Sequence, residues 1–171
     1  MWEAVTVQGT SISELGLGRA LANRPSAVVA AVFGVVLLTA HAGAQETTRV
    51  SVDSAGIEGN AKSMEPRISW NGQFVAFFSF SRDLVPGDTN AYVDMFVHDR
   101  QNRTTTRVSV DSSGAQANHH SMEGGAISGD GRFVAFGSLA SNLVPADINA
   151  SEDVFVHDRQ TGTTSPPCQR V

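Results

Sequence analysis

The chain has 171 residues, of which 41% are hydrophobic, which suffices for one ordinary domain with an apolar core. Its 12 basic and 17 acidic residues give a net charge of −5, and the basic residues are scattered along the sequence. This distribution argues against a nucleic-acid partner. The single cysteine, Cys168, can form neither an internal disulfide nor a cysteine metal cluster.

The N-terminal part has the layout of a secretory signal peptide. Arg19 and Arg24 precede an apolar stretch at residues 27–40, and small residues follow at Ala40 and Ala42. We expect residues 1–44 to be a signal peptide with a preceding extension, which places the protein in the periplasm or outside the cell. The alternative is a membrane anchor, but the apolar stretch is shorter than the roughly 20 residues that cross a bilayer. We therefore expect no stable membrane span after cleavage.

The rest of the chain contains an internal repeat. Residues 48–54 (Thr-Arg-Val-Ser-Val-Asp-Ser) return as residues 106–112, an offset of 58. Residues 74–77, 84–86 and 96–101 return at an offset of 59, because one residue is inserted between Glu123 and Ile127. Identical strings at a constant offset predict a structural repeat.

Each copy predicts four short strands and no helix. In the first copy these are residues 67–70, 74–80, 93–98 and 104–110, and residues 153–157 are the third strand of the second copy. Asn71-Gly72 and Asp130-Gly131 join the first two strands of each copy, and both dipeptides favour a type I′ hairpin turn.

The apolar pattern predicts sheets that are covered on both faces. Residues 74–78 and 95–97 are apolar at successive positions, whereas a sheet with one solvated face would alternate. The expected fold is all-β: two four-stranded antiparallel propeller blades within residues 45–165, blade one at about 64–110 and blade two at about 122–165. Residues 166–171 are expected to form an irregular tail. A β-sandwich is the alternative, but it does not account for the near-identical copies.

Two nine-residue segments resemble a known family. Residues 69–77 (Ser-Trp-Asn-Gly-Gln-Phe-Val-Ala-Phe) and 128–136 (Ser-Gly-Asp-Gly-Arg-Phe-Val-Ala-Phe) are similar to the core of the TolB-type, WD-like β-propeller repeat. The resemblance covers roughly residues 49–164. It implies a propeller of several blades that works in the bacterial envelope as an interaction platform.

Two repeats are fewer than the roughly six or seven blades that such a propeller needs. The chain is therefore expected to be a piece of a larger propeller, with most of its last outer strand lost at Pro166 and Pro167, which cannot donate to a strand ladder. The function expected is that of an exported, non-catalytic scaffold that binds proteins. The alternative is the propeller portion of an exported peptidase or glycoside hydrolase whose catalytic part is missing.

The long connections of the two copies are the expected place for a partner. Antiparallel topology puts them at one end of the blades, at residues 53–65, 81–91, 111–125 and 141–150. Solvated surface is the alternative interpretation.

A doubled acidic pattern lies in these loops. Asp88, Asn90 and Asp94 return as Asp147, Asn149 and Asp153, and such oxygen groups suit calcium. The match to a calcium loop is incomplete, because Tyr92 and Val93 stand where an EF-hand has a ligand and a glycine. Asp and Asn also stabilise turns by themselves. We assign no metal or cofactor and leave calcium as an open alternative.

The remaining polar groups predict structure and not catalysis. His98 and His157 are repeated at strand ends and are expected to be structural, whereas His119 and His120 are expected in a solvated loop. Residues 125–129 (Gly-Ala-Ile-Ser-Gly) have the wrong spacing for a nucleophile elbow, and the sialidase-like Asp box around Asp130 closes one residue early. We therefore predict that the protein is not an enzyme.

An isolated pair of blades is expected to leave one apolar face bare at each end. Phe77, Phe78, Phe96, Phe136 and Phe155 would supply much of that surface. Residues 48–52 read as an orphan fourth strand that would fill the vacated place in blade two of another chain. The partners expected are another protein, further blades, or a second copy of this chain.

Overall fold

The computed structural model describes residues 46–166. The segment interpreted as a signal peptide, residues 1–44, lies outside this range, as do residues 167–171. In the part that is described, no helix is both long and apolar enough to cross a membrane.

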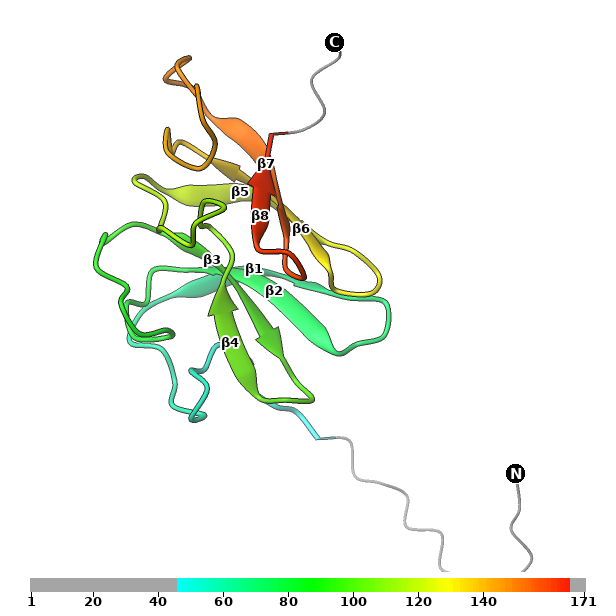
Figure 1. The fold of residues 1–171 in the computed structure, drawn as a ribbon. Coiled ribbons are helices and arrows are strands. Elements are labelled where there is room, and N and C mark those ends of the chain that lie inside the picture. Colours follow the sequence, from blue (N-terminus) through cyan, green and yellow to red (C-terminus); the bar gives the residue numbers. More distant parts are fainter. Residues whose placement is uncertain (1–45, 167–171) are drawn as a thin grey trace, which may run out of the picture. The chain divides into compact units, whose positions relative to one another are not determined.

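The described chain folds into two four-stranded antiparallel sheets (Figure 1). Each sheet is a meander, in which every strand pairs with its neighbours in sequence. The predicted fold class, all-β with two four-stranded antiparallel blades, is therefore confirmed. The strands are β1 (Ser63–Ile68), β2 (Phe74–Ser79), β3 (Asp94–Asp99) and β4 (Thr104–Arg107) in blade one, and β5 (Ser121–Ile127), β6 (Phe133–Ser138), β7 (Asp153–Asp158) and β8 (Thr163–Ser165) in blade two.

The two blades share register and backbone conformation. Phe77 pairs with Phe96 in blade one, and Phe136 pairs with Phe155 in blade two. Ala91 has a positive φ of 63°, and its counterpart Ala150 has a φ of 50°. Left-handed backbone is rare for residues other than glycine, so its recurrence at the same loop position shows that the repeat extends to the loops.

The tight turns differ from the predicted type I′. Gly72 and Gly131 have positive φ, but Asn71 and Asp130 do not. Asn71 instead accepts hydrogen bonds on its Oδ1 from the Ser69 hydroxyl and the Gln73 amide, at 2.6 and 3.0 Å. These local bonds hold the side chain as an Asx turn, so only the glycine needs the left-handed conformation.

Two strand boundaries also differ from the prediction. The first strand begins at Ser63 and not near Arg67, because an irregularity between Met64 and Arg67 interrupts the alternating pattern. The last strand, β8, keeps three residues, against four in β4, so most of the outer strand is not lost. Thr163–Ser165 still pair with β7, and Pro166 is the last residue that the structure describes.

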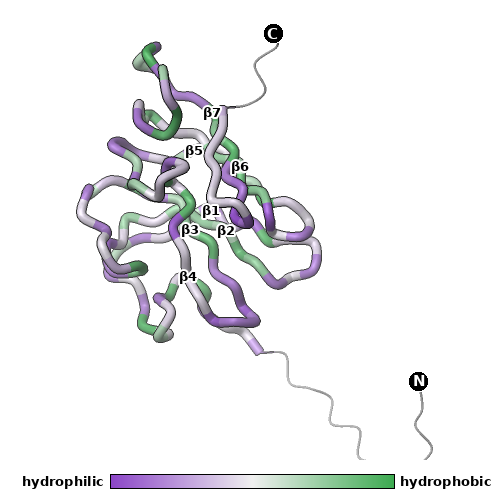
Figure 2. Tube along the Cα trace, in the orientation of Figure 1, coloured by the Kyte–Doolittle hydropathy of each residue, from purple (hydrophilic) through white to green (hydrophobic). Residues whose placement is uncertain are grey.

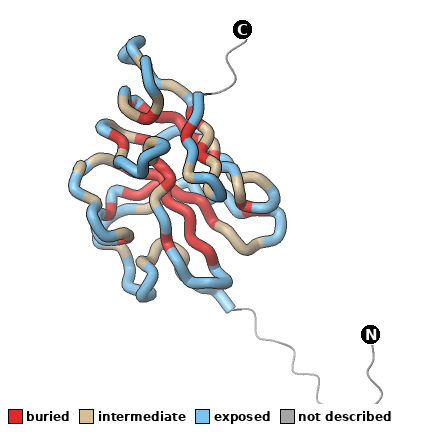
Figure 3. The backbone as a smooth tube through the Cα atoms, viewed as in Figure 1, coloured by how far each residue is buried: buried red, intermediate tan, exposed pale blue. Residues whose placement is uncertain are grey.

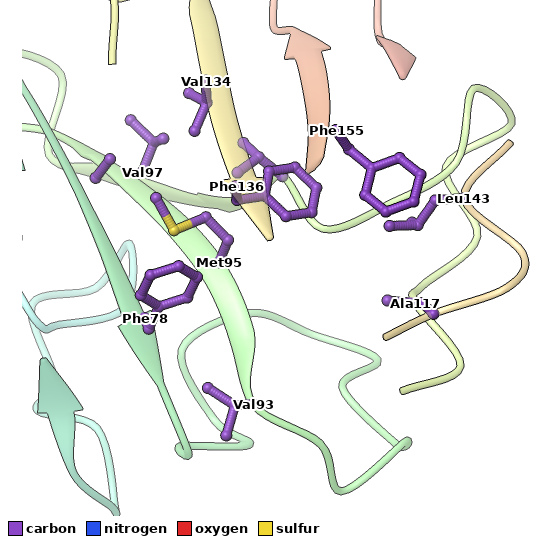
Figure 4. Packing of buried hydrophobic residues seen from close by; sticks show 12 residues of the cluster. Phe78, Val93, Met95, Val97, Ala117, Val134, Phe136, Leu143 and Phe155 are labelled. Atoms are coloured by element: carbon purple, nitrogen blue, oxygen red, sulfur yellow. The ribbon is translucent and has the colours of Figure 1, made fainter. Parts of the chain in front are cut away.

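The main core lies between the two blades. Phe78 and Met95 of blade one face Phe136 and Phe155 of blade two, and all four side chains are buried (Figure 4). Ala117, in the connection between the blades, is buried in the same cluster. Buried residues follow the strands, while the loops are mostly exposed (Figure 3). The turn between β3 and β4 is hydrophilic (Figure 2).

The five phenylalanines expected at bare faces are all buried. Phe77 and Phe96 stack with ring centroids 6.0 Å apart, and Leu84, from the loop after β2, packs on them. Phe78, Phe136 and Phe155 belong to the core between the blades. The expectation was wrong because a loop covers Phe77 and Phe96, while packing between the two blades buries the other three.

Candidate functional site

The long connections lie together, joined by hydrogen bonds. The Ala61 amide donates to Ser81 Oγ at 2.9 Å, which joins residues 53–65 to residues 81–91. The Asn118 amide donates to Asn142 Oδ1 at 2.9 Å, which joins residues 111–125 to residues 141–150. The Gln116 side chain donates to Thr89 Oγ1 at 2.7 Å and so joins the two pairs, which makes the loops a continuous surface at one end of the blades.

A buried charge cluster lies in blade one at this end. Arg107 Nη1 is 3.5 Å from both Asp88 Oδ1 and Asp94 Oδ2, and the two carboxylate side chains are 1% and 0% exposed. Ser109 donates to Asp94 Oδ1 at 2.6 Å. We call Asp88, Asp94 and Arg107 the arginine cluster. Three of its polar atoms, Asp88 Oδ1, Asp94 Oδ2 and Arg107 Nε, have no hydrogen-bond partner.

The segment that follows β4 closes this cluster. The Val108 amide donates to the Met95 carbonyl at 2.8 Å, and the Met95 amide donates to Ser109 Oγ at 3.1 Å. Arg107 Nη1 also donates to Gln116 Oε1 at 2.9 Å. The chain therefore runs alongside β3 with Arg107 and Ser109 directed at the acidic groups and Val108 in the core.

Burial dominates the electrostatics of the cluster. It raises the pKa of Asp94, while the hydrogen bond from Ser109 and the charge of Arg107 act in the opposite direction. Burial also raises the pKa of Asp88, again opposed by Arg107. A buried carboxylate needs a compensating charge, and Arg107 supplies it here.

The geometry in blade one gives calcium little support. The Asn90 side chain is engaged by the backbone, since its Oδ1 accepts the Tyr92 amide and its Nδ2 donates to the Ala117 carbonyl. Arg107 stands where a metal ion would neutralise Asp88 and Asp94. Within residues 46–166, no group of three or more His, Cys, Asp or Glu side chains is placed to hold a metal ion. Arg107 is not among the site residues predicted from sequence, although it belongs to the repeated Thr-Arg-Val-Ser string.

The same acidic residues in blade two lie in an open pocket of about 270 Å³. Asn149 Nδ2 donates to Asp153 Oδ2 at 2.7 Å, and Pro166 stands at the position of Arg107. The pocket is more accessible than the arginine cluster, since Ile148 at its rim is 91% exposed. We call the site formed by Asp147, Asn149, Asp153 and Pro166 the acidic pocket.

The repeated histidines take part in hydrogen bonds that join the outer strand of each blade to the segment preceding that blade, which agrees with a structural role. His98 Nδ1 lies 2.9 Å from Thr105 Oγ1, whose hydroxyl donates to the Val52 carbonyl. A hydroxyl has one proton, so Nδ1 must carry the hydrogen that bonds to Thr105. His157 and Thr164 repeat this arrangement in blade two.

The neighbouring pair His119 and His120 differs from the expected solvated loop. Both rings are half-buried and pack on Tyr92, with centroid distances of 5.1 and 4.9 Å. His120 Nδ1 accepts the Val93 amide at 3.0 Å. Aromatic packing and this bond order the pair, a tertiary effect that the sequence pattern does not reveal.

The serine of the Gly-Ala-Ile-Ser-Gly string has a structural role. Ser128 Oγ donates to Asp130 Oδ1 at 2.5 Å and accepts the Phe133 amide at 2.9 Å, so it holds the turn between β5 and β6.

Comparison with known proteins gives a likeness among solved structures. No protein-family model matches the sequence, and no curated protein matches it. Among solved structures, the chain is similar to TolB from Acinetobacter baumannii, with 19% identity and a TM-score of 0.39. The alignment covers 61% of this chain and 21% of that one, so the chain spans only a fraction of the length of that structure.

Proposed function

We propose that the protein is an exported, non-catalytic module of propeller blades that binds a protein partner through blade two. The observation that carries this proposal is a difference between equivalent positions. Met95 in blade one is fully buried, whereas its counterpart Val154 in blade two is 52% exposed. The acidic pocket, which includes Asp153 next to Val154 in the sequence, is open, while the equivalent arginine cluster is closed.

The chemistry of this surface defines the partner. Ile148 offers exposed apolar area next to the negative charge of Asp147 and Asp153, and Val154 offers exposed apolar area on the other face of β7. Interfaces combine apolar anchors with complementary charges. The partner that fits presents a basic residue flanked by small apolar side chains.

Two further observations support a non-catalytic role and export. The repeated polar groups have structural partners: His98 and His157 bond to threonines, and Ser128 holds a turn. Export is supported by Arg19 and Arg24 ahead of the apolar stretch and by the Ala-x-Ala sites, which have the layout of a signal peptide.

The experiment is site-specific photo-crosslinking in a bacterial host, combined with fractionation. A photoreactive residue replaces Ile148 in the acidic pocket or, as the control, Trp70, which is 95% exposed at a tight turn. We expect exported protein with a defined crosslinked partner from position 148 and none from position 70. Retention in the cytoplasm would refute export, and equal crosslinking at both positions would refute the binding site.

A further inference from the structure

The two blades contact each other through two different faces of the same repeat. Phe78 and Met95 pair across β2 and β3, so they point to one face of blade one, the face that meets blade two. Blade two contributes Phe136 and Phe155 to this contact (Figure 4). Phe136 is the counterpart of Phe77, which neighbours Phe78 in the strand and therefore points to the opposite face. We call the face of Phe78 the forward face of a blade and the face of Phe77 its backward face.

Gly125 of β5 shows how closely the two faces approach. A Cβ at Gly125 would lie 2.9 Å from Met95 Cε and 3.2 Å from Phe78 Cε2. The contact therefore needs large side chains on the forward face of blade one and no side chain at this position on the backward face of blade two.

The forward face of blade two lacks these large side chains. Glu123 corresponds to the half-buried Met64, because the two residues pair with equivalent positions of β6 and β2. In total, four apolar side chains of blade one that lie in the core or against it, Met64, Phe78, Val93 and Met95, are replaced by Glu123, Gly137, Glu152 and Val154. Glu123 and Glu152 are exposed, as is Val154.

The two glutamates lie beside the place that Phe78 fills in blade one. A Cβ at Gly137 would lie 2.6 Å from Glu152 Oε1 and 3.3 Å from Glu123 Cβ. A sheet that packed on this face would remove water from both carboxylates, and an apolar face offers no positive charge in exchange. The forward face of blade two thus has neither the shape nor the polarity of the forward face of blade one.

The backward face of blade one has the complementary change. Pro66 occupies the position of Gly125, since each follows a residue with positive φ in the irregular part of its strand: Glu65 at 52° and Gly124 at 69°. Pro66 is exposed. Even a Cβ at Gly125 would come too close to Met95, so the ring of Pro66 obstructs a preceding blade that carries side chains of this size.

We propose that both outward faces of this blade pair are terminal faces, which do not accept a blade with the contact residues of blade one or blade two. Terminal repeats with a polar outer face keep repeat arrays from associating further. The inference goes beyond the proposed function, because it concerns stacking between blades of this repeat and not the binding of a partner that brings positive charge.

The experiment restores the residues of the contact and measures association by sedimentation velocity over a range of concentrations, with the full chain as a bacterial host produces it. The first variant, which we call the forward graft, combines Glu123→Met, Gly137→Phe, Glu152→Val and Val154→Met. The second variant adds Pro66→Gly to the forward graft. We expect wild type to be monomeric and the forward graft to associate weakly, because Pro66 still obstructs the backward face. The second variant should associate roughly tenfold more tightly than the forward graft, as expected when overpacking is relieved.

The matched control is Gln101→Phe combined with Gln160→Phe, at exposed positions in the tight turns after β3 and β7. It adds apolar surface away from both faces, so it should sediment like wild type. If the forward graft loses the circular dichroism spectrum of wild type, Glu152→Val combined with Val154→Met replaces it, because this variant leaves Gly137 unchanged. The same direction of change is then expected, with a smaller size.

Three results would overturn the inference. The first is wild type that associates and becomes monomeric on Val154→Arg, since that outcome would show stacking through the forward face. The second is grafted chains that sediment like wild type, or that associate no more than the control. The third is a Pro66→Gly change that has no effect in the graft. Crosslinking from position 148 probes the acidic pocket instead, so this inference and the proposed function can fail independently.

Discussion

Thr164 of β8 donates its hydroxyl proton to the backbone carbonyl of Val110, which lies 54 residues earlier in the chain. Thr105 makes the same bond to Val52 in blade one. In both cases the outer strand is tied to the segment that enters its blade, and a histidine supplies the second hydrogen bond of the threonine. We call this pair of hydrogen bonds, from histidine to threonine and from threonine to a backbone carbonyl, the threonine relay, and it occurs in both blades.

The first prediction concerns a substitution that removes these hydrogen bonds and keeps the shape of the threonine side chain. Thr164→Val leaves the Val110 carbonyl and His157 Nδ1 without their partner, so we expect a loss of about 1–3 kcal/mol in the free energy of unfolding. Urea denaturation followed by circular dichroism measures it. Thr104→Val is the control, because Thr104 is exposed on β4. Equal stabilities of the two variants would contradict the role of the relay.

The second prediction concerns pH. Burial lowers the pKa of His98, His157 and His120 below the ordinary value of 6.5. The unfolded chain therefore binds protons first as the pH falls, and the folded state loses stability below about pH 6.5. For His120, protonation of Nδ1 also breaks the bond from the Val93 amide.

The measurement is the free energy of unfolding between pH 8 and pH 5, for wild type and His157→Gln. Burial raises the pKa of Asp94, which acts in the opposite direction at lower pH, but that effect is common to both proteins. The difference between the two free energies of unfolding therefore gives the contribution of His157 alone. We expect a shallower loss of stability in His157→Gln, and parallel curves would refute the assignment.

The third prediction tests the arginine cluster. Arg107→Met keeps most of the side-chain length but leaves Asp88 and Asp94 buried without a positive charge. We expect a loss of about 3–5 kcal/mol, as for other buried ion pairs that lose one partner. Arg67→Met, at an exposed position on β1, should change stability by less than about 0.5 kcal/mol. Thermal melting at neutral pH compares the two methionine variants. Similar melting temperatures would show that Asp88 and Asp94 need no compensating positive charge.

The fourth prediction addresses calcium directly. Since Arg107 already lies between Asp88 and Asp94, we expect millimolar calcium to leave the melting temperature of wild type unchanged. Magnesium at the same concentration controls for ionic strength. A calcium-specific rise in melting temperature that disappears in Asp153→Asn would instead assign an ion to the acidic pocket.

The fifth prediction separates turn conformation from packing between blades. Gly72 and Gly131 have φ values of 70° and 77°, so alanine at either position is strained, by about 1–2 kcal/mol. At Gly131 a Cβ would lie 2.0 Å from Phe74 Cδ2, whereas at Gly72 the nearest atom, from Arg100, is 3.9 Å away. Gly131→Ala should therefore cost about 1–3 kcal/mol more than Gly72→Ala.

Chemical denaturation of both alanine variants measures this difference. Phe74→Leu combined with Gly131→Ala should lose less stability than the sum of the two single changes, because the smaller side chain relieves the contact. Additive effects would show that Phe74 and Gly131 do not meet as described.

The sequence by itself determined the repeat, the four strands of each copy and the all-β class. Identical strings such as residues 48–54 and 106–112 report repetition directly, and the Asn-Gly and Asp-Gly dipeptides mark the tight turns whatever lies around them. The apolar runs at residues 74–78 and 95–97 require cover on both faces, which excludes a sheet with one solvated face.

Only the tertiary structure decided what each repeated residue does. Arg107 and Asp88 are 19 positions apart in the numbering, and they meet because the end of β4 pairs with β3 beside the loop that holds Asp88. Burial of Phe77 by a loop, and packing of His119 on Tyr92, likewise join parts of the chain whose separation no local pattern encodes. Equivalent aspartates form a closed cluster in blade one and an open pocket in blade two. The difference follows from Arg107 in one blade and Pro166 in the other. Only the arginine brings the positive charge that two buried carboxylates require.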